Sequence, residues 1–422
     1  MKKISLVLKL SALLFLSLST TVQSQWSFLI YADPAAEITE AVIKNLNDLV
    51  QSYNSLEVQV YVQLRVFISQ DASKSHAWRY RAHDNCLQFV EAIEMTEDFY
   101  TDVTSAMAWA YGQADVTTTN FGLLFSGHGC GILEPESTAT SGSLGVEHDD
   151  AQCLTCNRHF VHMPKKSILL NEFTGKAMDN STMLNIMNFG TTLIGSKFDF
   201  VGFDLCLGAM LEHAYQLVPY VQFLVGYQYC AAVEGFDYFA LGKQLQKADC
   251  SPESLARHMV QSHESYSMKL APHHKHTLSA LDCSAAVSVV VALDAFALFC
   301  MNLISQNSQL VDEIMTVRKD CYHACWVPMY TDLYQVVTQI GTNIAPFLTI
   351  DEQVALQALI TDVQNQIDNL VLEKFTSENL SHLHGINIYF PYSHIDRSYY
   401  RAPFAQSSMW VKFLEMVINE DN

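Results

Sequence analysis

The chain has 422 residues, 50% of them hydrophobic, and it carries 44 acidic against 24 basic residues. This composition excludes a disordered polymer, a collagen-like repeat and a coiled coil, because each of these needs fewer apolar residues or a far more biased sequence. The acidic excess and the lack of a basic cluster disfavour nucleic acid as a partner, since its phosphates carry the same charge sign. The length predicts two or three compact units, or one large α/β unit with an appended part.

Residues 1–24 have the three parts of a secretory signal peptide. Met1-Lys2-Lys3 is a positively charged start, residues 10–18 are apolar, and residues 22–24 read as a cleavage signal. We therefore expect a secreted or periplasmic protein that has no stable membrane insertion after signal removal. A second apolar stretch, residues 285–304, contains Asp294 near its middle, which favours a buried helix over a membrane span.

Short strands alternate with amphipathic helices along the first half of the chain. Apolar runs and apolar/polar alternation predict strands at 26–31, 58–66, 121–126, 198–205 and 221–227. Helical periodicity predicts helices between them at 38–49, 99–110 and 208–217. Alternation in residues 58–66 is typical of a strand buried on one face only. The β-α-β-α order predicts a mainly parallel sheet with helices on both faces.

The second half has the same elements in a looser order. Ser251 followed by Pro252 predicts a helix start, and Thr349 with Glu352 predicts a capping box. Residues 385–390 predict a strand that ends at a proline. We expect a catalytic unit over residues 25–270 with an irregular inserted loop at 134–166, and a C-terminal α/β part over residues 271–422 packed on it.

Two predicted strand ends carry residues suited to catalysis. The strand 121–126 is followed by Gly127-His128-Gly129, and the strand 198–205 ends in Asp204-Leu205-Cys206. In an open α/β sheet the loops at the carboxyl ends of neighbouring strands converge, so we expect His128 and Cys206 to face each other. A thiolate there would attack a carbonyl while the imidazole protonates the leaving group. Gly129 is the expected backbone donor to the oxyanion, together with the Cys206 N–H.

Each of these residues also has a structural interpretation. A histidine in a glycine turn is often structural, and a lone cysteine after an apolar strand is often a small buried hydrophobe. The two residues together favour catalysis. Both follow apolar strands, and the histidine precedes the cysteine along the chain, as it does in caspases. Asp204 can equally cap the next helix, and Glu212 reads as a packing or capping group.

The chain has 11 cysteines, an odd number, so complete pairing in an oxidising compartment leaves at least one thiol over. Cys206 is the candidate for that free thiol. Cys153, Cys156, His159 and His162 follow one another at spacings of three, which is compatible with zinc. Disulfides are the favoured interpretation of these cysteines, because the spacing lacks the usual loop between ligand pairs.

The sequence resembles the clostripain-like cysteine peptidases, relatives of caspases, gingipains and legumains, from about Trp26 to the C-terminus. The segments that carry this resemblance are Trp26 to Ala32, Asn45 to Leu49, Leu123 to Gly129, Asp204 to Leu207 with Glu212, Glu234 to Tyr238, Thr277 to Cys283, Asp332 to Tyr334, and Gly385 to Pro391. Gly127 and Ile132 depart from the family pattern, which affects the expected pocket shape more than the catalytic pair.

The resemblance implies a caspase-like three-layer α/β/α sandwich and a His128/Cys206 catalytic dyad. It also implies that Asp204 lies near the base of the pocket for the residue before the cut, which would select Arg or Lys. Glu234 and Asp237 are further candidates for this pocket. Members of the family sometimes use calcium, but the sequence has no EF-hand pattern, so no cofactor is firmly implied.

Two functions follow from these observations. The favoured one is a secreted cysteine endopeptidase that acts on protein or peptide substrates. The alternative is a non-catalytic secreted binding protein of the same fold. Family members are often activated by a cut between the two motifs, and Arg158, Lys165 and Lys166 in the loop 134–166 are candidate sites for self-cleavage.

Overall fold

A computed structural model describes residues 25–34, 38–52, 58–66, 76–96, 98–114, 118–134, 167–171, 176–321 and 327–418 of the chain. The elements of the first half are β1 (Trp26–Asp33), α2 (Thr39–Gln51), β2 (Val58–Val66), β3 (His76–His83), β4 (Cys86–Glu94), α3 (Phe99–Tyr111), β5 (Asn120–Gly127), β6 (Leu169–Asn171), β7 (Lys176–Met178), α4 (Asn180–Ile194), β8 (Phe198–Asp204), α5 (Leu211–Leu217) and β9 (Val221–Gly226). Those of the second half are α6 (Tyr238–Leu245), α7 (Pro252–Leu270), β10 (Thr277–Asp282), η3 (Cys283–Ala285), α8 (Ala286–Gln306), α9 (Leu310–Asp320), β11 (Tyr330–Asp332), α10 (Leu333–Ile344), η4 (Ala345–Phe347), α11 (Ile350–Leu370), β12 (Val371–Thr376), η5 (Glu378–Leu380), β13 (Asn387–Tyr389), η6 (Tyr399–Arg401), α12 (Pro403–Ser407) and α13 (Trp410–Val417).

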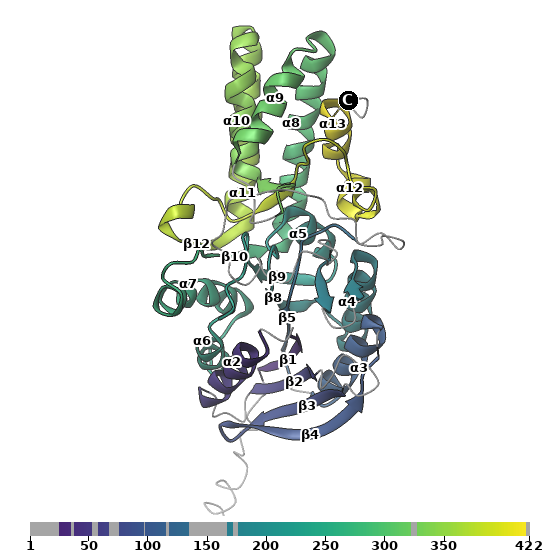
Figure 1. Ribbon diagram of the computed structural model, residues 1–422, viewed down its shortest axis with the longest axis vertical. Coiled ribbons are helices and arrows are strands. Elements are labelled where there is room, and N and C mark those ends of the chain that lie inside the picture. The colour runs from purple at the N-terminus through teal and green to yellow at the C-terminus, as the bar shows by residue number, and fades with distance from the viewer. Residues whose placement is uncertain are drawn as a thin grey trace, which may run out of the picture.

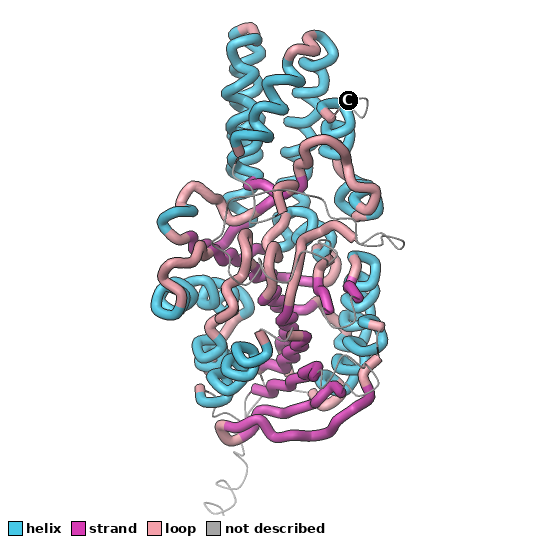
Figure 2. The backbone as a smooth tube through the Cα atoms, viewed as in Figure 1, coloured by secondary structure: helices cyan, strands magenta, loops and turns pink. Residues whose placement is uncertain are grey.

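A central sheet runs through the molecule (Figure 2). In the described part of the chain it has nine strands in the order β12-β10-β9-β8-β5-β1-β2-β3-β4. The five central strands, β9, β8, β5, β1 and β2, run parallel to one another. The two strands added at each edge pair in antiparallel fashion. The expected mainly parallel sheet is confirmed, and the antiparallel strands extend it at both edges.

Helices cover both faces of this sheet and make a three-layer α/β/α sandwich (Figure 1). Helices α2, α6 and α7 pack on one face, where their apolar residues join a core with Phe28, Ile30 and Phe200 of the strands. Helices α3, α4 and α5 pack on the other face, around Leu29, Phe125 and Phe203. Alternate residues of the same strands serve the two cores, which is why the strands read as apolar runs.

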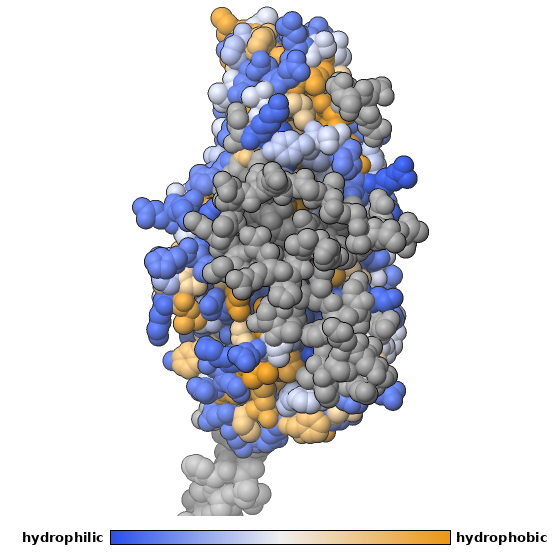
Figure 3. Space-filling model, viewed as in Figure 1, coloured by the Kyte–Doolittle hydropathy of each residue, from blue (hydrophilic) through white to orange (hydrophobic). Residues whose placement is uncertain are grey.

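The C-terminal part both completes the sheet and builds a helical arm. Its strands β10 and β12 join the sheet beside β9, so residue 270 does not separate two sheets. Helices α8 to α11 project from one end of the sandwich (Figure 1), and Figure 3 shows apolar side chains among polar ones on this arm. The segment Cys283–Gln306 is long and apolar enough to cross a membrane, but half of its most apolar window is buried. The expected helix at 285–304 is therefore confirmed.

Strand β2 differs from the expectation for residues 58–66. The strand was expected to expose Gln63 and Arg65, yet both side chains are buried. Arg65 forms ion pairs with Asp33 at 3.0 Å and with Asp102 of α3 at 3.4 Å. Gln63 donates to Asp102 Oδ1 at 3.1 Å. Both faces are buried because α3 covers this side of the sheet and supplies a carboxylate to the polar residues.

Helix ends follow the capping signals in the sequence where the signal is local. Ser251 accepts from the Ser254 N–H at the start of α7, and Thr349 with Glu352 forms the expected capping box of α11. Two expected elements are shorter in the structure. Helix α5 begins at Leu211, because residues 205–210 form a turn, and β13 spans only Asn387–Tyr389.

Replacing Arg65 by Met should destabilise the protein strongly. The change leaves the carboxylates of Asp33 and Asp102 buried without their cation, and breaking a buried ion pair in this way costs about 3–5 kcal/mol. Urea unfolding at pH 7 measures the loss. The control is Arg81→Met on the exposed side of β3, where we expect a change of about 0.5 kcal/mol or less. Equal midpoints for both variants would contradict the assigned role of Arg65.

Candidate active site

His128 and Cys206 follow neighbouring parallel strands. Ser126 of β5 lies opposite Asp204 of β8, and His128 and Cys206 each come two residues later. The segment after β5 passes directly against the turn after β8, since a Cβ added to Gly129 would lie 2.9 Å from the Cys206 carbonyl oxygen. His128 is 7% exposed and Cys206 is 6% exposed. The structure therefore places the two residues in adjacent backbone segments at the carboxyl edge of the sheet.

The backbone around His128 is held from two sides. The Leu170 N–H of β6 donates to the His128 carbonyl at 2.9 Å. Gly131 has a φ of 81°, and a Cβ there would lie 2.6 Å from the Tyr330 ring, so only glycine fits this turn. The Tyr330 hydroxyl in turn accepts from the Leu133 N–H at 3.2 Å. The histidine loop is thus fixed by β6 and by a tyrosine of the C-terminal part.

The turn that carries Cys206 is held by the residues that follow β9. The Leu207 N–H donates to the Tyr229 carbonyl at 3.2 Å, and the Ala209 N–H donates to the Tyr227 carbonyl at 2.9 Å. The Ala231 N–H points at the Cys206 sulfur at 3.3 Å. Leu207 adopts a φ of 62°, a left-handed conformation that is costly for a residue with a side chain. Such strain persists only where the surrounding contacts enforce it.

Asp204 is a buried carboxylate surrounded by hydrogen-bond donors. It accepts from the Tyr238 hydroxyl at 2.9 Å and the Phe236 N–H at 3.0 Å, with longer contacts to the Ser126 hydroxyl at 3.4 Å and the Tyr227 hydroxyl at 3.5 Å. Burial raises the pKa of Asp204 to about 6, although all four hydrogen bonds lower it. Asp204 is therefore a strand-end carboxylate that does not cap α5.

The segment 234–237 passes over Asp204 through its backbone. Gly235 has a φ of 63°, and a Cβ there would lie 2.8 Å from Asp204 Oδ2. The Glu234 carbonyl accepts from Asn45 Nδ2 at 2.8 Å, and the Glu234 side chain is half-buried. Asp237 accepts from the Ala240 N–H at 2.9 Å and so caps α6, while burial raises its pKa. Glu234 and Asp237 thus belong to the segment that passes over Asp204, and helix capping accounts for the position of Asp237.

Glu212 lies behind the cysteine turn in α5. Its Oε1 accepts from the Tyr389 N–H at 2.8 Å and from the Tyr399 hydroxyl at 3.1 Å. The residue is fully buried, and this burial raises its pKa to about 7. Its contacts agree with the packing role expected from the sequence.

The cysteines show one disulfide-bonded and several free residues in the described part of the chain. Cys230, next to the active-site turn, is disulfide-bonded. The free cysteines are Cys86, Cys130, Cys206, Cys250, Cys283, Cys300 and Cys321. Cys206 is thus available as a thiol.

Within the described residues no group of three or more His, Cys, Asp or Glu side chains could hold a metal ion. The tract with Cys153, Cys156, His159 and His162 lies outside them, so the zinc alternative stays a prediction.

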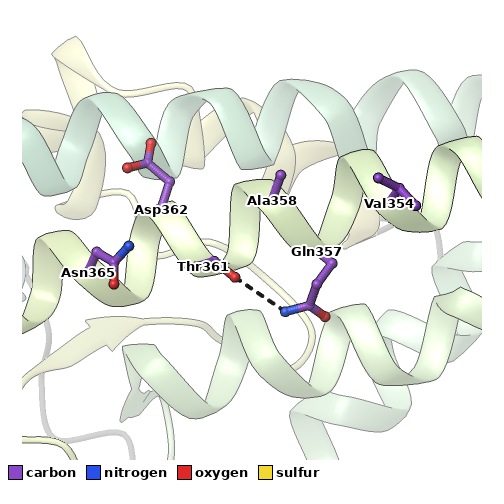
Figure 4. A pocket seen from close by; sticks show the side chains of 6 residues that line it. All are labelled: Val354, Gln357, Ala358, Thr361, Asp362 and Asn365. Carbon is purple, nitrogen blue, oxygen red and sulfur yellow. Dashed lines mark hydrogen bonds between the residues drawn. The ribbon is translucent and has the colours of Figure 1, made fainter.

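A hollow of about 460 Å³ lies elsewhere, on α11 of the helical arm (Figure 4). Its lining residues are Val354, Gln357, Ala358, Thr361, Asp362 and Asn365. None of these is a candidate catalytic residue. The lining contains a single carboxylate and neither cysteine nor histidine, so it lacks the pair of groups that a cysteine peptidase needs.

Sequence reasoning missed the residues that surround the two motifs. Tyr227 and Ala231 contact Asp204 and Cys206, but nothing in their local pattern sets them apart from other residues after a strand. Their only sequence signal is their position just after β9, the strand next to β8 in the sheet. Tyr238 is the last residue of the segment Glu234 to Tyr238 that carries the family resemblance, but its spacing from Asp204 gives no signal that the two meet.

Solved structures with the same fold cover nearly the whole chain. A secreted C11 cysteine protease from Bacteroides thetaiotaomicron, in complex with an irreversible peptide inhibitor, is 14% identical and has a TM-score of 0.62, covering 93% of this chain and 99% of its own. An inactive zymogen C11 protease from Parabacteroides distasonis is 12% identical, with a TM-score of 0.56 and coverage of 92% and 97%. These likenesses confirm the caspase-like α/β/α fold.

A search of curated proteins returns no match. The sequence model of the clostripain family, in contrast, matches residues 173–417, which is more than half of the chain. The matched range includes Cys206 and begins after His128. The chain therefore belongs to the clostripain family and is a cysteine-type peptidase.

Proposed function

We propose that the protein is an extracytoplasmic cysteine endopeptidase that uses Cys206 as nucleophile and His128 as acid–base catalyst, and that cuts after Arg or Lys. The observation that carries this proposal is the parallel register of β5 and β8, with Ser126 opposite Asp204. It supports the pairing of a free cysteine with a histidine at one sheet edge. Export is supported by the signal sequence in residues 1–24 and by the secreted relatives of the same fold.

The proposed reaction proceeds in two steps. The Cys206 sulfur attacks the carbonyl carbon of the scissile bond, and His128 protonates the leaving amine as the acyl-enzyme forms. Water, deprotonated by His128, then releases the acid and restores the thiol. The N–H groups of Gly129 and Cys206 are the proposed donors to the oxyanion, since the two segments lie in contact.

Cys206→Ala and His128→Ala should each lower kcat by at least about a thousandfold, because each removes a group that acts in every turnover. The fold should persist, since the Cys206 change removes a single sulfur atom. Peptide hydrolysis and thermal unfolding measure the two effects. Cys283→Ala, another buried free cysteine, is the matched control and should keep full activity. Wild-type turnover in Cys206→Ala would refute the proposed nucleophile.

The proposed preference for Arg or Lys rests on Asp204. A carboxylate that faces a guanidinium gains charge-assisted hydrogen bonds, and a neutral side chain would leave the buried charge unpaired. The contacts from Ser126 at 3.4 Å and Tyr227 at 3.5 Å are long. A substrate cation can displace these two weak donors while Tyr238 and the Phe236 N–H hold the carboxylate in place.

This preference should depend on pH. Asp204 must be ionised to attract a cation, and burial raises its pKa to about 6. The ratio of kcat/KM for a peptide with Arg to one with citrulline, its neutral analogue, should be about a hundredfold above pH 7 and fall about tenfold per pH unit below 6. Titration of the dyad cancels in this ratio.

The variant Asp204→Asn should give a low ratio at every pH, because the charge is absent throughout. Asp237→Asn, which changes a nearby capping carboxylate, should keep the wild-type profile. A high ratio in Asp204→Asn, or a wild-type ratio that stays constant between pH 5 and 8, would rule out Asp204 as the specificity group.

We also propose self-cleavage within residues 134–166, of which residues 135–166 lie outside the described part of the chain. The ends of this segment are firmly held. The Glu134 carboxylate binds Arg401 Nε at 2.8 Å and Nη2 at 2.6 Å, and on the far side the Cys130 N–H donates to the Ser167 carbonyl at 2.8 Å. A cut between them would leave both new ends attached to the body.

Mass spectrometry of the wild type should therefore find cuts after Arg158, Lys165 or Lys166 that are missing in Cys206→Ala. The two fragments should separate under reducing and denaturing conditions and elute together in native gel filtration. An active wild-type enzyme that is uncut over 134–166 would contradict the proposal, as would equal cutting of the mutant.

A further inference from the structure

Gln228 is a buried amide at the junction between the active-site segment and the C-terminal part. It is 1% exposed, and both its amide oxygen and its amide nitrogen form hydrogen bonds. Its Oε1 accepts from the Gly385 N–H at 2.9 Å, and its Nε2 donates to Asp332 Oδ2 at 2.7 Å and to Asn387 Oδ1 at 3.2 Å. Because one end faces an N–H and the other a carboxylate, this network fixes the orientation of the amide.

The residues on either side of Gln228 face the opposite way, toward Cys206. The carbonyls of Tyr227 and Tyr229 accept from the Ala209 and Leu207 N–H groups in the turn around the cysteine. Two residues further on, the Ala231 N–H points at the Cys206 sulfur at 3.3 Å. The backbone that holds the nucleophile is therefore itself held by the side chain of Gln228.

The partners of Gln228 are rigidly placed. Asp332 caps α10 through the Gln335 N–H at 2.9 Å and also accepts from the His384 N–H at 2.6 Å. Asn387 Nδ2 donates to the Gln228 carbonyl at 2.5 Å, and its own N–H donates to the Ala209 carbonyl at 3.0 Å. Asn387 thus contacts both the Gln228 segment and the cysteine turn. The strand pair β11 and β13 joins Asp332 to Asn387 in register.

We propose that Gln228 is a positioning residue for the nucleophile, which it orients through residues 227–231 and without contact with substrate. The inference rests on the proposed function of Cys206. The left-handed Leu207, with a φ of 62°, needs external contacts to persist, and the hydrogen bonds that the Leu207 and Ala209 N–H groups donate to the carbonyls of residues 229 and 227 supply them. Gln228, Asp332 and Asn387 hold those contacts in place from the other side.

The test is Gln228→Glu, which keeps the shape of the side chain and removes both amide donors. The new carboxylate would face the Asp332 carboxylate and the Asn387 carbonyl oxygen, so residues 227–231 should shift. A displacement of about 1 Å at a reacting atom costs up to roughly a hundredfold. We therefore expect kcat, normalised to titrated active sites, to fall about 10- to 100-fold, with KM changed by about threefold or less.

A second measurement reports on the thiol directly. The rate of Cys206 alkylation by iodoacetamide, followed by mass spectrometry of its peptide, needs no substrate pocket. It should fall about tenfold in Gln228→Glu, because the Ala231 N–H no longer holds the sulfur in its reactive position. A residue that only stabilised the fold would change neither this rate nor kcat per folded enzyme.

The matched control is Gln63→Glu in β2. Gln63 is also fully buried and also donates to an aspartate, Asp102, at 3.1 Å, but it belongs to the network around Arg65. This variant should lose stability, yet keep the alkylation rate and kcat. If Gln228→Glu does not fold, Asn387→Ala replaces it, since it removes the side-chain contacts with Gln228 and keeps the backbone bond to Ala209.

The outcomes separate this inference from the proposed function. The role of Gln228 is overturned if folded Gln228→Glu keeps the wild-type kcat and alkylation rate, or if Gln63→Glu loses as much of both. In either case an inactive Cys206→Ala still upholds Cys206 as the nucleophile. Wild-type activity in Cys206→Ala overturns the proposed function itself. Selective loss of kcat and of Cys206 alkylation in Gln228→Glu supports the inference.

Discussion

The register between two parallel strands is the constraint on which the site depends. Because β5 and β8 run side by side with Ser126 opposite Asp204, the residues that follow them emerge next to each other. A shift of one residue in this register would turn every side chain of one strand to the other face and separate His128 from Cys206. The two cores on either side of the sheet fix the register, since alternate residues of both strands pack into each of them.

The strand ends could be predicted because their signals are local. Apolar runs and alternation mark the strands up to Gly127 and Asp204, and the residues beyond them are read directly from the sequence. Helix starts with a capping side chain, such as Ser251 and Thr349, were found for the same reason. In each case the deciding contact lies within a few residues along the chain.

Polar residues in the core could not be predicted in this way. Arg65 and Gln63 alternate with valine and leucine, which is also the pattern of a strand with one exposed face, and their burial depends on Asp102 in a later helix. The start of α5 was misplaced because the turn at Leu207 is held by Tyr227 and Tyr229, after the next strand. Gln228 gave no signal at all, since its partners Asp332 and Asn387 lie 104 and 159 residues further on.

Asp204 illustrates how burial and hydrogen bonding act in opposite directions on the pKa of one carboxylate. Four donors favour its charged form, yet burial outweighs them and raises its pKa to about 6, so the carboxylate is not completely ionised near neutral pH. Under the proposed function, a bound guanidinium would add a full positive charge beside the carboxylate and lower that pKa again. Part of the binding free energy would then go into completing the ionisation of Asp204. A neutral side chain supplies no such charge, and burial strengthens the attraction between the ionised carboxylate and a cation, so ionised Asp204 would discriminate between cationic and neutral substrates.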